Sequence, residues 1–269
     1  MNRAARRRVA TDDLIDRVAL EELEAAHKDA RLSPVAVVIA AYKERQNIAA
    51  VVTSMPTEIA GLAVSVLVVV DGEDDGTGEA ARAAGALCAI APVNRGQGAA
   101  LRLGYRVARE RGAEFIVTAD ADGQSSADDL ATVLAPVIDG DADFVNGSRR
   151  LGDTHGTDVV RNAGVVLFAA LISALTRTKV TDTANPIRAF RSAFSATLDL
   201  EEPQYQASEL LISAIMGGAR FEERPVTMLK RRSGESKKGG NLLYGLRYGR
   251  VVLRTFRREL SARRSGPKG

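Results

Sequence analysis

The sequence predicts an α/β protein with a mostly parallel central sheet flanked by helices, and three observations support this class. Short runs rich in Val, Ile and Ala recur between residues 34 and 120. Stretches with a helical spacing of apolar residues separate these runs. Polar residues follow each run directly. Continuous apolar runs that alternate with amphipathic helices are typical of parallel strands covered on both faces.

The predicted strands and helices alternate along the first half of the chain. Four strands are expected at VAVVIAA (35–41), VSVLVVV (64–70), ALCAIAP (86–92) and EFIVTA (114–119). Helices are expected near 46–55, 76–85 and 97–112. Beyond DADFVNGSRR (141–150) the alternation is looser, with a helix near 159–176, a helix near 206–217 and a strand within 220–229. With 269 residues, 45% of them hydrophobic, the chain can bury a sizeable core.

Three regions are expected: an N-terminal basic arm and helix (1–33), a catalytic domain (34–238), and a basic amphipathic helix and tail (239–269). The helix of the arm is predicted to begin at a Thr11–Asp12 cap. The net charge of +3 conceals an asymmetry. From residue 220 onward, fifteen Lys/Arg against four Asp/Glu give +11, so the preceding 219 residues sum to −8. A basic tail indicates an anionic partner, unless its charges only solvate a helix.

Composition excludes several classes of protein. The single cysteine, Cys88, excludes a disulfide framework and a multi-cysteine zinc site, so a reducing cytoplasm is the expected compartment. The longest apolar stretch (163–175) falls short of the roughly 18 residues that a membrane span needs. The basic N-terminus lacks the apolar core of a secretion signal. The cytoplasmic face of a membrane is the alternative location.

The segment TADADGQSS (118–126) follows a predicted strand and is the strongest candidate site. Ligands of parallel sheets bind beyond the carboxyl ends of the strands. Asp120, Asp122 and Gln124 present hard oxygen ligands, which suit Mg²⁺ or Mn²⁺ and leave positions open for a diphosphate. The alternative is an Asx-rich surface turn. A dinucleotide fold is poorly supported, because Leu101 replaces the third glycine of the fingerprint in NRGQGAAL.

Several motifs in order resemble those of a known family. VVIAAYKERQNI, VVVDGEDDGT, NRGQGAALRLG and DADGQ resemble glycosyltransferase family 2, which has the GT-A fold with a Rossmann-like sheet. NGSRR, DTANPIRAFR, SELLISA, ERPV and RRSGESKKGGN resemble its dolichol-phosphate mannosyltransferase branch. Members of that branch move a sugar from a nucleotide to a polyprenyl phosphate. The resemblance covers about residues 34–245.

The resemblance implies roles for individual residues. Tyr42 and Glu44 would hold the nucleobase and ribose, and Asp71 would accept from a base N–H. Asp120, Ala121 and Asp122 would bind the nucleotide-sugar, with the two aspartates and Gln124 on the metal. The cations that would meet the donor diphosphate and the acceptor phosphate are Arg149, Arg188, Arg231 and Lys237. The departures leave the sugar and the base (uracil or guanine) open, and they are Ala40, Lys43, Val70, Ser125–Ser126 and Asn185–Pro186.

The implied reaction is a single displacement with inversion at the anomeric carbon. A phosphate acceptor is already ionised and needs no general base, whereas a hydroxyl acceptor needs one. Glu209 and Asp182 are the two candidates for a base. Either could be structural instead, with Glu209 capping a helix.

Two alternatives to a polyprenyl phosphate acceptor stay open. One is the same donor chemistry on a soluble hydroxyl acceptor, and the other is a non-catalytic nucleotide-sugar binder. The tail places apolar residues near one helix face with arginines around it, which favours peripheral membrane contact. The alternative is packing on its own domain or on a second subunit. Nucleic acid is not expected as a partner, because only Tyr244, Tyr248 and Phe256 of the tail could stack on bases.

Overall fold

The computed structural model describes residues 3–72, 75–152, 159–227, 229 and 242–264. The helices are α1 (Arg3–Ala26), α2 (Ile48–Ser54), α3 (Thr77–Ala83), α4 (Gln97–Glu110), α5 (Ala127–Ile138), α6 (Val159–Thr176), α7 (Ser192–Ser195), α8 (Gln206–Met216) and α9 (Leu242–Arg264). The strands are β1 (Val35–Ala41), β2 (Glu58–Ile59), β3 (Leu62–Asp71), β4 (Leu87–Ala91), β5 (Phe115–Asp120), β6 (Phe144–Ser148), β7 (Arg188–Arg191) and β8 (Phe221–Pro225).

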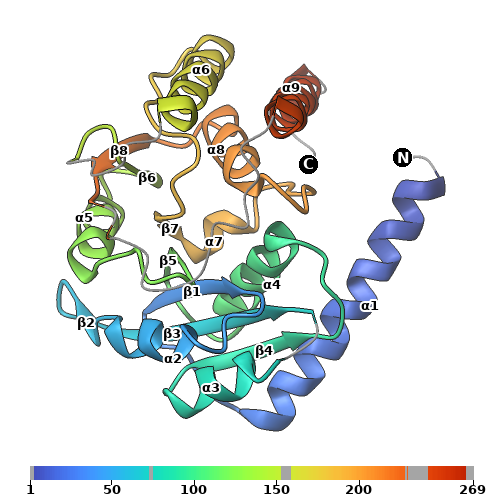
Figure 1. Cartoon of the computed structure of the whole chain (residues 1–269), viewed down its shortest axis with the longest axis vertical. Coiled ribbons are helices and arrows are strands. Elements are labelled where there is room, and N and C mark those ends of the chain that lie inside the picture. Colours follow the sequence, from blue (N-terminus) through green and yellow to red (C-terminus); the bar gives the residue numbers. More distant parts are fainter. Residues whose placement is uncertain (1–2, 73–74, 153–158, 228, 230–241, 265–269) are drawn as a thin grey trace.

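The described strands form one mixed sheet in the order β2-β3-β1-β5-β7-β6-β8, with β4 beside β3 (Figure 1). Strands β4, β3, β1 and β5 run parallel, as the apolar runs predicted. Strand β7 is antiparallel to both β5 and β6, and it places Arg188 between Thr118 and Asn146. The looser second half of the sequence therefore becomes the mixed half of the sheet.

Two buried apolar clusters cover the two faces of the sheet. One includes Val38, Leu67 and Leu103, and the other includes Val37, Val68 and Leu134. Successive residues of a strand thus belong alternately to one cluster and to the other, as expected for a sheet covered on both faces. Gly104 brings α4 close to β1, because a Cβ there would lie 2.5 Å from Cγ1 of Val38.

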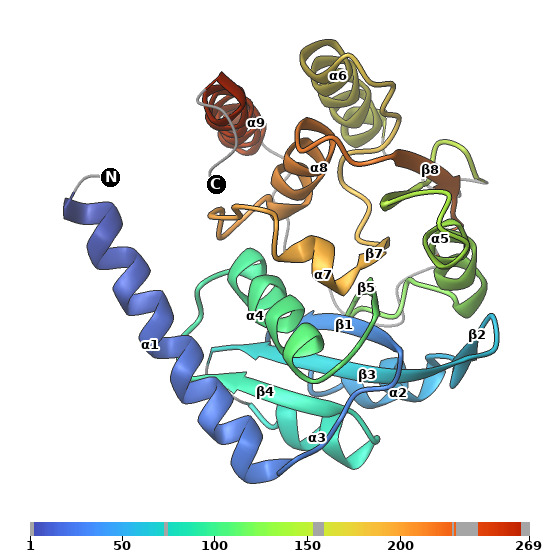
Figure 2. The same cartoon turned by 180° about the vertical axis from the view of Figure 1, so that it is seen from behind.

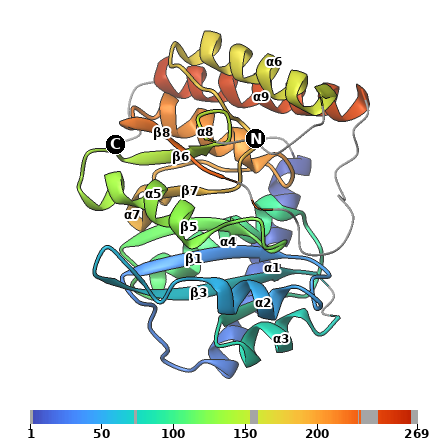
Figure 3. The same cartoon turned by 60° about the vertical axis from the view of Figure 1, so that its left-hand side comes forward.

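Both terminal helices pack against the same core. Ala19 of α1 and Val252 of α9 are completely buried in the first cluster. Helix α1 crosses the β4 edge of the sheet (Figure 2). Helix α9 lies beside α6 and over α8 (Figure 3). The apolar face of the tail is therefore divided between the protein interior and the surface, and packing on its own domain, the alternative left open above, is present.

Most predicted elements begin and end within a few residues of their expected positions. The largest boundary error is in α1, which begins at Arg3 and runs through the Thr11–Asp12 pair that was expected to cap it. Helix α5 and strand β7 were not predicted, and the segment DTANPIRAFR that contains β7 carries no clear period. No helix among the described residues is long and apolar enough to cross a membrane.

Candidate active site

The carboxyl ends of the parallel strands bring the predicted donor residues to one edge of the sheet. Asp71 ends β3 and Asp120 ends β5, on either side of β1. In the register, Ala40 of β1 pairs with Asp120 and Ala41 pairs with Val70. Tyr42 follows β1 directly, so the motifs after three strands meet at this edge.

The turn after β5 carries the predicted metal ligands. Gly123 has a φ of 73°, a conformation that favours glycine, and it reverses the chain between Asp122 and Gln124. Oδ1 of Asp122 accepts from the backbone amide of Gln124 at 3.2 Å, so the turn contains the Asx geometry that was the alternative to a metal site, and the choice between the two stays open. The side-chain amide nitrogen of Gln124 donates to the carbonyl of Leu229 at 2.9 Å. That bond orients the side chain and leaves its amide oxygen as the atom that a cation would take.

The donor set of this turn fits a hard divalent cation. It offers two carboxylates and one amide oxygen, the ligand types that Mg²⁺ and Mn²⁺ prefer. No group of three or more His, Cys, Asp and Glu side chains that could hold a metal occurs among the described residues. A cation here would therefore rely on Asp120, Asp122, Gln124 and the oxygens of a substrate. Gln97, at the start of α4, donates to Oδ1 of Asp120 at 3.0 Å and orients that carboxylate.

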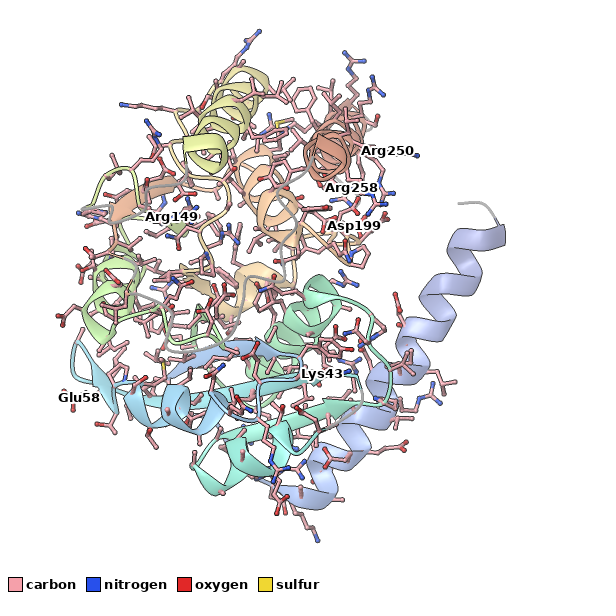
Figure 4. All side chains as sticks on the ribbon, in the orientation of Figure 1. Lys43, Glu58, Arg149, Asp199, Arg250 and Arg258 are labelled. Carbon is pink, nitrogen blue, oxygen red and sulfur yellow. The ribbon has the colours of Figure 1, made fainter. Side chains whose placement is uncertain are left out.

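The residues predicted to hold the nucleoside lie on the loops after β1 and β3. Tyr42 is 37% exposed, and the Nζ of Lys43 lies 5.4 Å from the centre of its ring (Figure 4 shows Lys43 at the end of β1). Oε2 of Glu44 accepts from the side chain of Asn47 at 2.8 Å. Neither contact tests the predicted role in nucleoside binding, so that role stays a prediction.

Asp71 holds the loop after β4 in place. Its two carboxylate oxygens accept from the backbone amides of Arg95 (2.9 Å) and Gly96 (2.7 Å). Burial raises the pKa of the Asp71 carboxyl, although the two amide hydrogen bonds act in the opposite direction. The predicted bond to a nucleobase would have to be made in addition to these two.

Arg188 is a buried cation beside this edge of the sheet. The residue is 2% exposed, its Nε donates to Oδ1 of Asn146 at 3.1 Å, and its Nη2 has no partner among the described residues. Burial lowers the pKa of the Arg188 guanidinium, and the negative charges of Asp182 and Asp120 counteract part of this effect. A buried, incompletely bonded guanidinium suits an anionic ligand.

Both carboxylate oxygens of Asp182, a predicted candidate base, are already hydrogen-bonded. Asp182 is completely buried, and its carboxylate oxygens accept from Nε (2.6 Å) and Nη2 (2.8 Å) of Arg149 and from the amide of Ala184 (3.0 Å). Burial alone would raise the pKa of Asp182, but the bonds from Arg149 outweigh it and hold the pKa below its usual value. These bonds favour the structural alternative for Asp182, as a clamp on Arg149, and the predicted roles of the two residues in catalysis and phosphate binding stay predictions.

Glu209 is bound in a similar way, which favours the structural alternative for this residue too. It is completely buried, and it accepts from the backbone amides of Glu201 (2.8 Å) and Glu202 (2.9 Å). Arg258 of α9 completes the clamp with an Nη1–Oε1 distance of 2.9 Å. Glu209 thus ties α9 and the loop before α8 to α8 itself, and its partners within the described part of the chain do not include the first turn of its own helix. The two remaining predicted cations, Arg231 and Lys237, lie outside the described residues.

Sequence reasoning missed three residues that organise the site. Glu223 of β8 accepts from the amides of Thr181 (2.7 Å) and Asp182 (3.2 Å), and from the side chain of Asn146 (3.0 Å). Asn146 in turn holds Arg188, and Gln97 holds Asp120. The sequence signal that could have identified Asn146 is its position as a polar residue within the short segment FVNGS. The only sequence signal for Gln97 is its position in the glycine-rich segment NRGQG.

Comparison with known proteins identifies the family of this chain. The family model described as Glycosyl transferase family 2 matches residues 36–198. A dolichyl-phosphate hexose transferase of Haloferax volcanii is 33% identical over 202 residues, which cover 75% of this chain and 85% of that protein. An undecaprenyl-phosphate mannosyltransferase of Micrococcus luteus is 29% identical over 212 residues, with coverages of 75% and 84%.

A solved structure supports the fold. Glucosyl-3-phosphoglycerate synthase of Mycobacterium tuberculosis, in complex with Mn²⁺, UDP and glucosyl-3-phosphoglycerate, superposes with a TM-score of 0.64. The two chains are 21% identical, and the match covers 89% of this chain and 83% of that one. With carboxylates at the ends of parallel strands and a family match over more than half its length, this chain belongs to glycosyl transferase family 2 and is a glycosyltransferase with the GT-A fold.

Proposed function

We propose that this chain transfers a sugar from a UDP- or GDP-linked donor to the phosphate of a polyprenyl phosphate, with a divalent cation as cofactor. An oxygen of the acceptor phosphate forms a bond to the anomeric carbon. The bond between that carbon and the donor diphosphate breaks, and the nucleoside diphosphate leaves with the bonding electrons. The attack comes from the opposite side, so the configuration inverts. Two relatives, a dolichyl-phosphate hexose transferase and an undecaprenyl-phosphate mannosyltransferase, support this acceptor class.

The observation that carries the proposal is the absence of an available base among the described candidates. Asp182 and Glu209 are completely buried and paired with arginines. A hydroxyl acceptor must lose a proton as it attacks, whereas a phosphate oxygen is already ionised at neutral pH. The site therefore suits a phosphate acceptor better than a hydroxyl acceptor.

The donor is assigned to the edge between Tyr42 and the Asp120–Gln124 turn. Asp120, Asp122 and Gln124 would hold Mg²⁺ or Mn²⁺, which would neutralise charge on the leaving diphosphate. Arg188, whose Nη2 has no partner among the described residues, would add a second positive charge nearby. Tyr42 and Glu44 would contact the nucleoside.

A peripheral membrane contact is part of the proposal. On α9, Leu246 is 64% and Leu253 is 40% exposed, and the exposed Arg250 and Arg257 follow the same face. The neighbouring helix α6 exposes Leu167 (65%) and Val166 (44%). Exposed leucines beside arginines suit the interface of an anionic bilayer, where a polyprenyl phosphate resides.

Vesicle co-sedimentation tests the membrane contact. Leu246→Glu combined with Leu253→Glu should reduce binding to phosphatidylglycerol-containing vesicles by about tenfold, because both carboxylates oppose insertion. Leu14→Glu on α1, where Leu14 is 57% exposed, is the matched control and should bind like the wild type. Equal binding of the double variant would exclude this face of α9.

Nucleotide release tests the reaction. The purified chain is supplied with Mn²⁺ and a panel of UDP- and GDP-sugars, with a short-chain polyprenyl phosphate or with the corresponding alcohol. Release stimulated by the phosphate and not by the alcohol is the expected result. Stimulation by soluble hydroxyl acceptors instead would favour natural-product or surface-glycan synthesis. No turnover with any donor would favour a non-catalytic nucleotide-sugar binder.

A further inference from the structure

A cavity of about 490 Å³ lies beside the candidate active site. Its walls are the loop after β4, the loop before α8 and one flank of α9, and we call it the arginine cavity. The four arginines that line it are Arg95, Arg247, Arg250 and Arg254. Gly96 also lines the cavity, and the next residue in the chain, Gln97, donates to Asp120. The cavity therefore adjoins the predicted metal-binding turn.

Helix α9 has three faces, and one of them lines the arginine cavity. Tyr248 and Val252 point into the core, and Leu246 and Leu253 lie on the exposed face. The residues of the flank between them share the spacing of three to four that marks one side of a helix. They are Arg247, Val251, Arg254 and Arg258. Arg250 borders both the flank and the exposed face (Figure 4 labels Arg250 and Arg258 on α9).

The cavity carries more positive charge than its own residues neutralise. Arg254 lies 2.7 Å from Glu202, the one acidic residue among those that line the cavity. Arg247 and Arg250 are exposed and form no ion pair with any residue that the structure describes. An anionic ligand would balance these two charges.

Arg95 provides a second, independent indication of a ligand. Its side chain is 9% exposed, and Nε has no hydrogen-bond partner among the described residues. Asp16 of α1 lies 2.5 Å from Nη2, so the side chain is held at the cavity. A buried N–H without a partner is costly unless a ligand or a water molecule accepts from it.

Hydrogen bonds join one wall of the cavity, the loop before α8, to helix α4, which follows the loop after β4. The amide of Gly98 donates to the carbonyl of Pro203 at 2.8 Å, and Nη1 of Arg102 donates to the carbonyl of Glu202 at 2.9 Å. A Cβ on Gly98 would lie 2.1 Å from that Glu202 oxygen, so the loop packs directly on the glycine. Tyr205, which also lines the cavity, holds a φ of 61°. Such strained backbone is concentrated at functional sites.

We propose that the arginine cavity binds the phosphate of the acceptor substrate, a phosphomonoester, with Arg247 and Arg250 as its principal cations. The inference rests on the proposed function and names the residues that would recognise its acceptor. Arg149 is engaged by Asp182, so a cation for the acceptor is needed elsewhere. Arg250 also borders the exposed face of α9. The cavity would thus link the proposed membrane face with the turn at Asp120.

Isothermal titration with phosphate ligands tests the cavity without requiring turnover. The probes are glycerol 3-phosphate, as a soluble phosphomonoester, and farnesyl phosphate, as a lipid one. Arg247→Gln combined with Arg250→Gln should weaken binding by at least about tenfold, since two charge-assisted contacts are lost. Arg17→Gln, an exposed arginine of α1 outside the cavity, is the control and should bind like the wild type.

The two probes distinguish the source of the phosphate. Binding of farnesyl phosphate alone, lost in the double variant, supports the cavity with a lipid acceptor. Binding of glycerol 3-phosphate alone or of both probes, lost in the same variant, supports it with recognition of the phosphate itself. Equal affinity of the double variant and the wild type, or no binding to the wild type at millimolar concentration, would overturn the proposal.

Steady-state kinetics separate this proposal from the proposed function. The double variant should raise the KM for the phosphate acceptor about tenfold and change the KM for the nucleotide-sugar less than twofold. A rise in the donor KM alone would overturn the acceptor assignment. Phosphate binding without any sugar transfer would refute the proposed function and leave the anion site standing.

Discussion

The molecule contains two groups of carboxylates that differ in how deeply they are buried. Asp120 ends β5, Asp122 lies in the turn that follows, and both are partly exposed. Asp182 and Glu209 are completely buried, and each is paired with an arginine from a distant part of the chain. The comparison indicates that burial, rather than residue type, distinguishes the carboxylates proposed to meet a ligand from those proposed to hold the fold together.

The largest effect is expected from breaking the Asp182 clamp. Asp182→Asn leaves the mostly buried Arg149 without its negative partner, which should lower the free energy of unfolding by about 3–5 kcal/mol. Urea unfolding followed by circular dichroism measures this difference. A loss below about 1 kcal/mol would show that Asp182 does not carry the structural role assigned to it.

At the edge of the sheet the expected effect is on activity. Asp122→Asn should reduce nucleotide release at least about 100-fold, equivalent to about 2.7 kcal/mol, because a neutral amide is a weaker ligand for a divalent cation. The free energy of unfolding should change little, since Asp122 is partly exposed. Release close to that of the wild type would contradict the metal assignment.

A smaller loss of stability is expected at the second clamp. Glu209→Gln keeps one acceptor oxygen but removes the charge that faces Arg258, and Arg258 retains Glu259 at 3.1 Å. We expect the free energy of unfolding to fall by about 1–3 kcal/mol. The rate of sugar transfer per folded molecule should stay within a few-fold of the wild type. A 100-fold loss of rate in a fully folded variant would restore Glu209 as a candidate base.

The smallest effect concerns pH. The pKa of Asp182 is lowered from 3.8 in the folded protein, so its contribution to stability is present above that value and is lost as pH falls through the folded pKa. The stability difference between the wild type and Asp182→Asn should therefore be constant from pH 7 to about pH 5 and shrink progressively as the pH falls further. A difference that shrinks between pH 7 and pH 5 would contradict the depressed pKa.

The parallel half of the fold could be predicted because its residues act locally. Val35–Ala41 was predicted with the boundaries that the structure has, since an unbroken apolar run identifies a buried strand. The turn at Asp120 and Asp122 could be predicted for the same reason, because it follows a strand directly. Helix α1 was misjudged at its start, because Thr11 resembles a cap but the helix continues past it.

The buried ion pairs could not be predicted, because their partners are far apart in sequence. Asp182 meets Arg149 only because β7 inserts between β5 and β6. Glu209 meets Arg258 only because α9 folds back over α8. Neither contact can be inferred from the spacing of residues in the sequence. The sequence alone therefore does not distinguish Asp182 and Glu209 from a predicted metal ligand such as Asp122.

Mn²⁺ binding in the presence of UDP or GDP, followed by electron paramagnetic resonance, tests the comparison most directly. The wild type and Glu209→Gln should each bind one Mn²⁺ per chain with similar affinity, whereas Asp122→Asn should bind at least about tenfold more weakly. Equal binding by Asp122→Asn, or loss of binding in a folded Glu209→Gln variant, would contradict the division between ligand-binding and structural carboxylates.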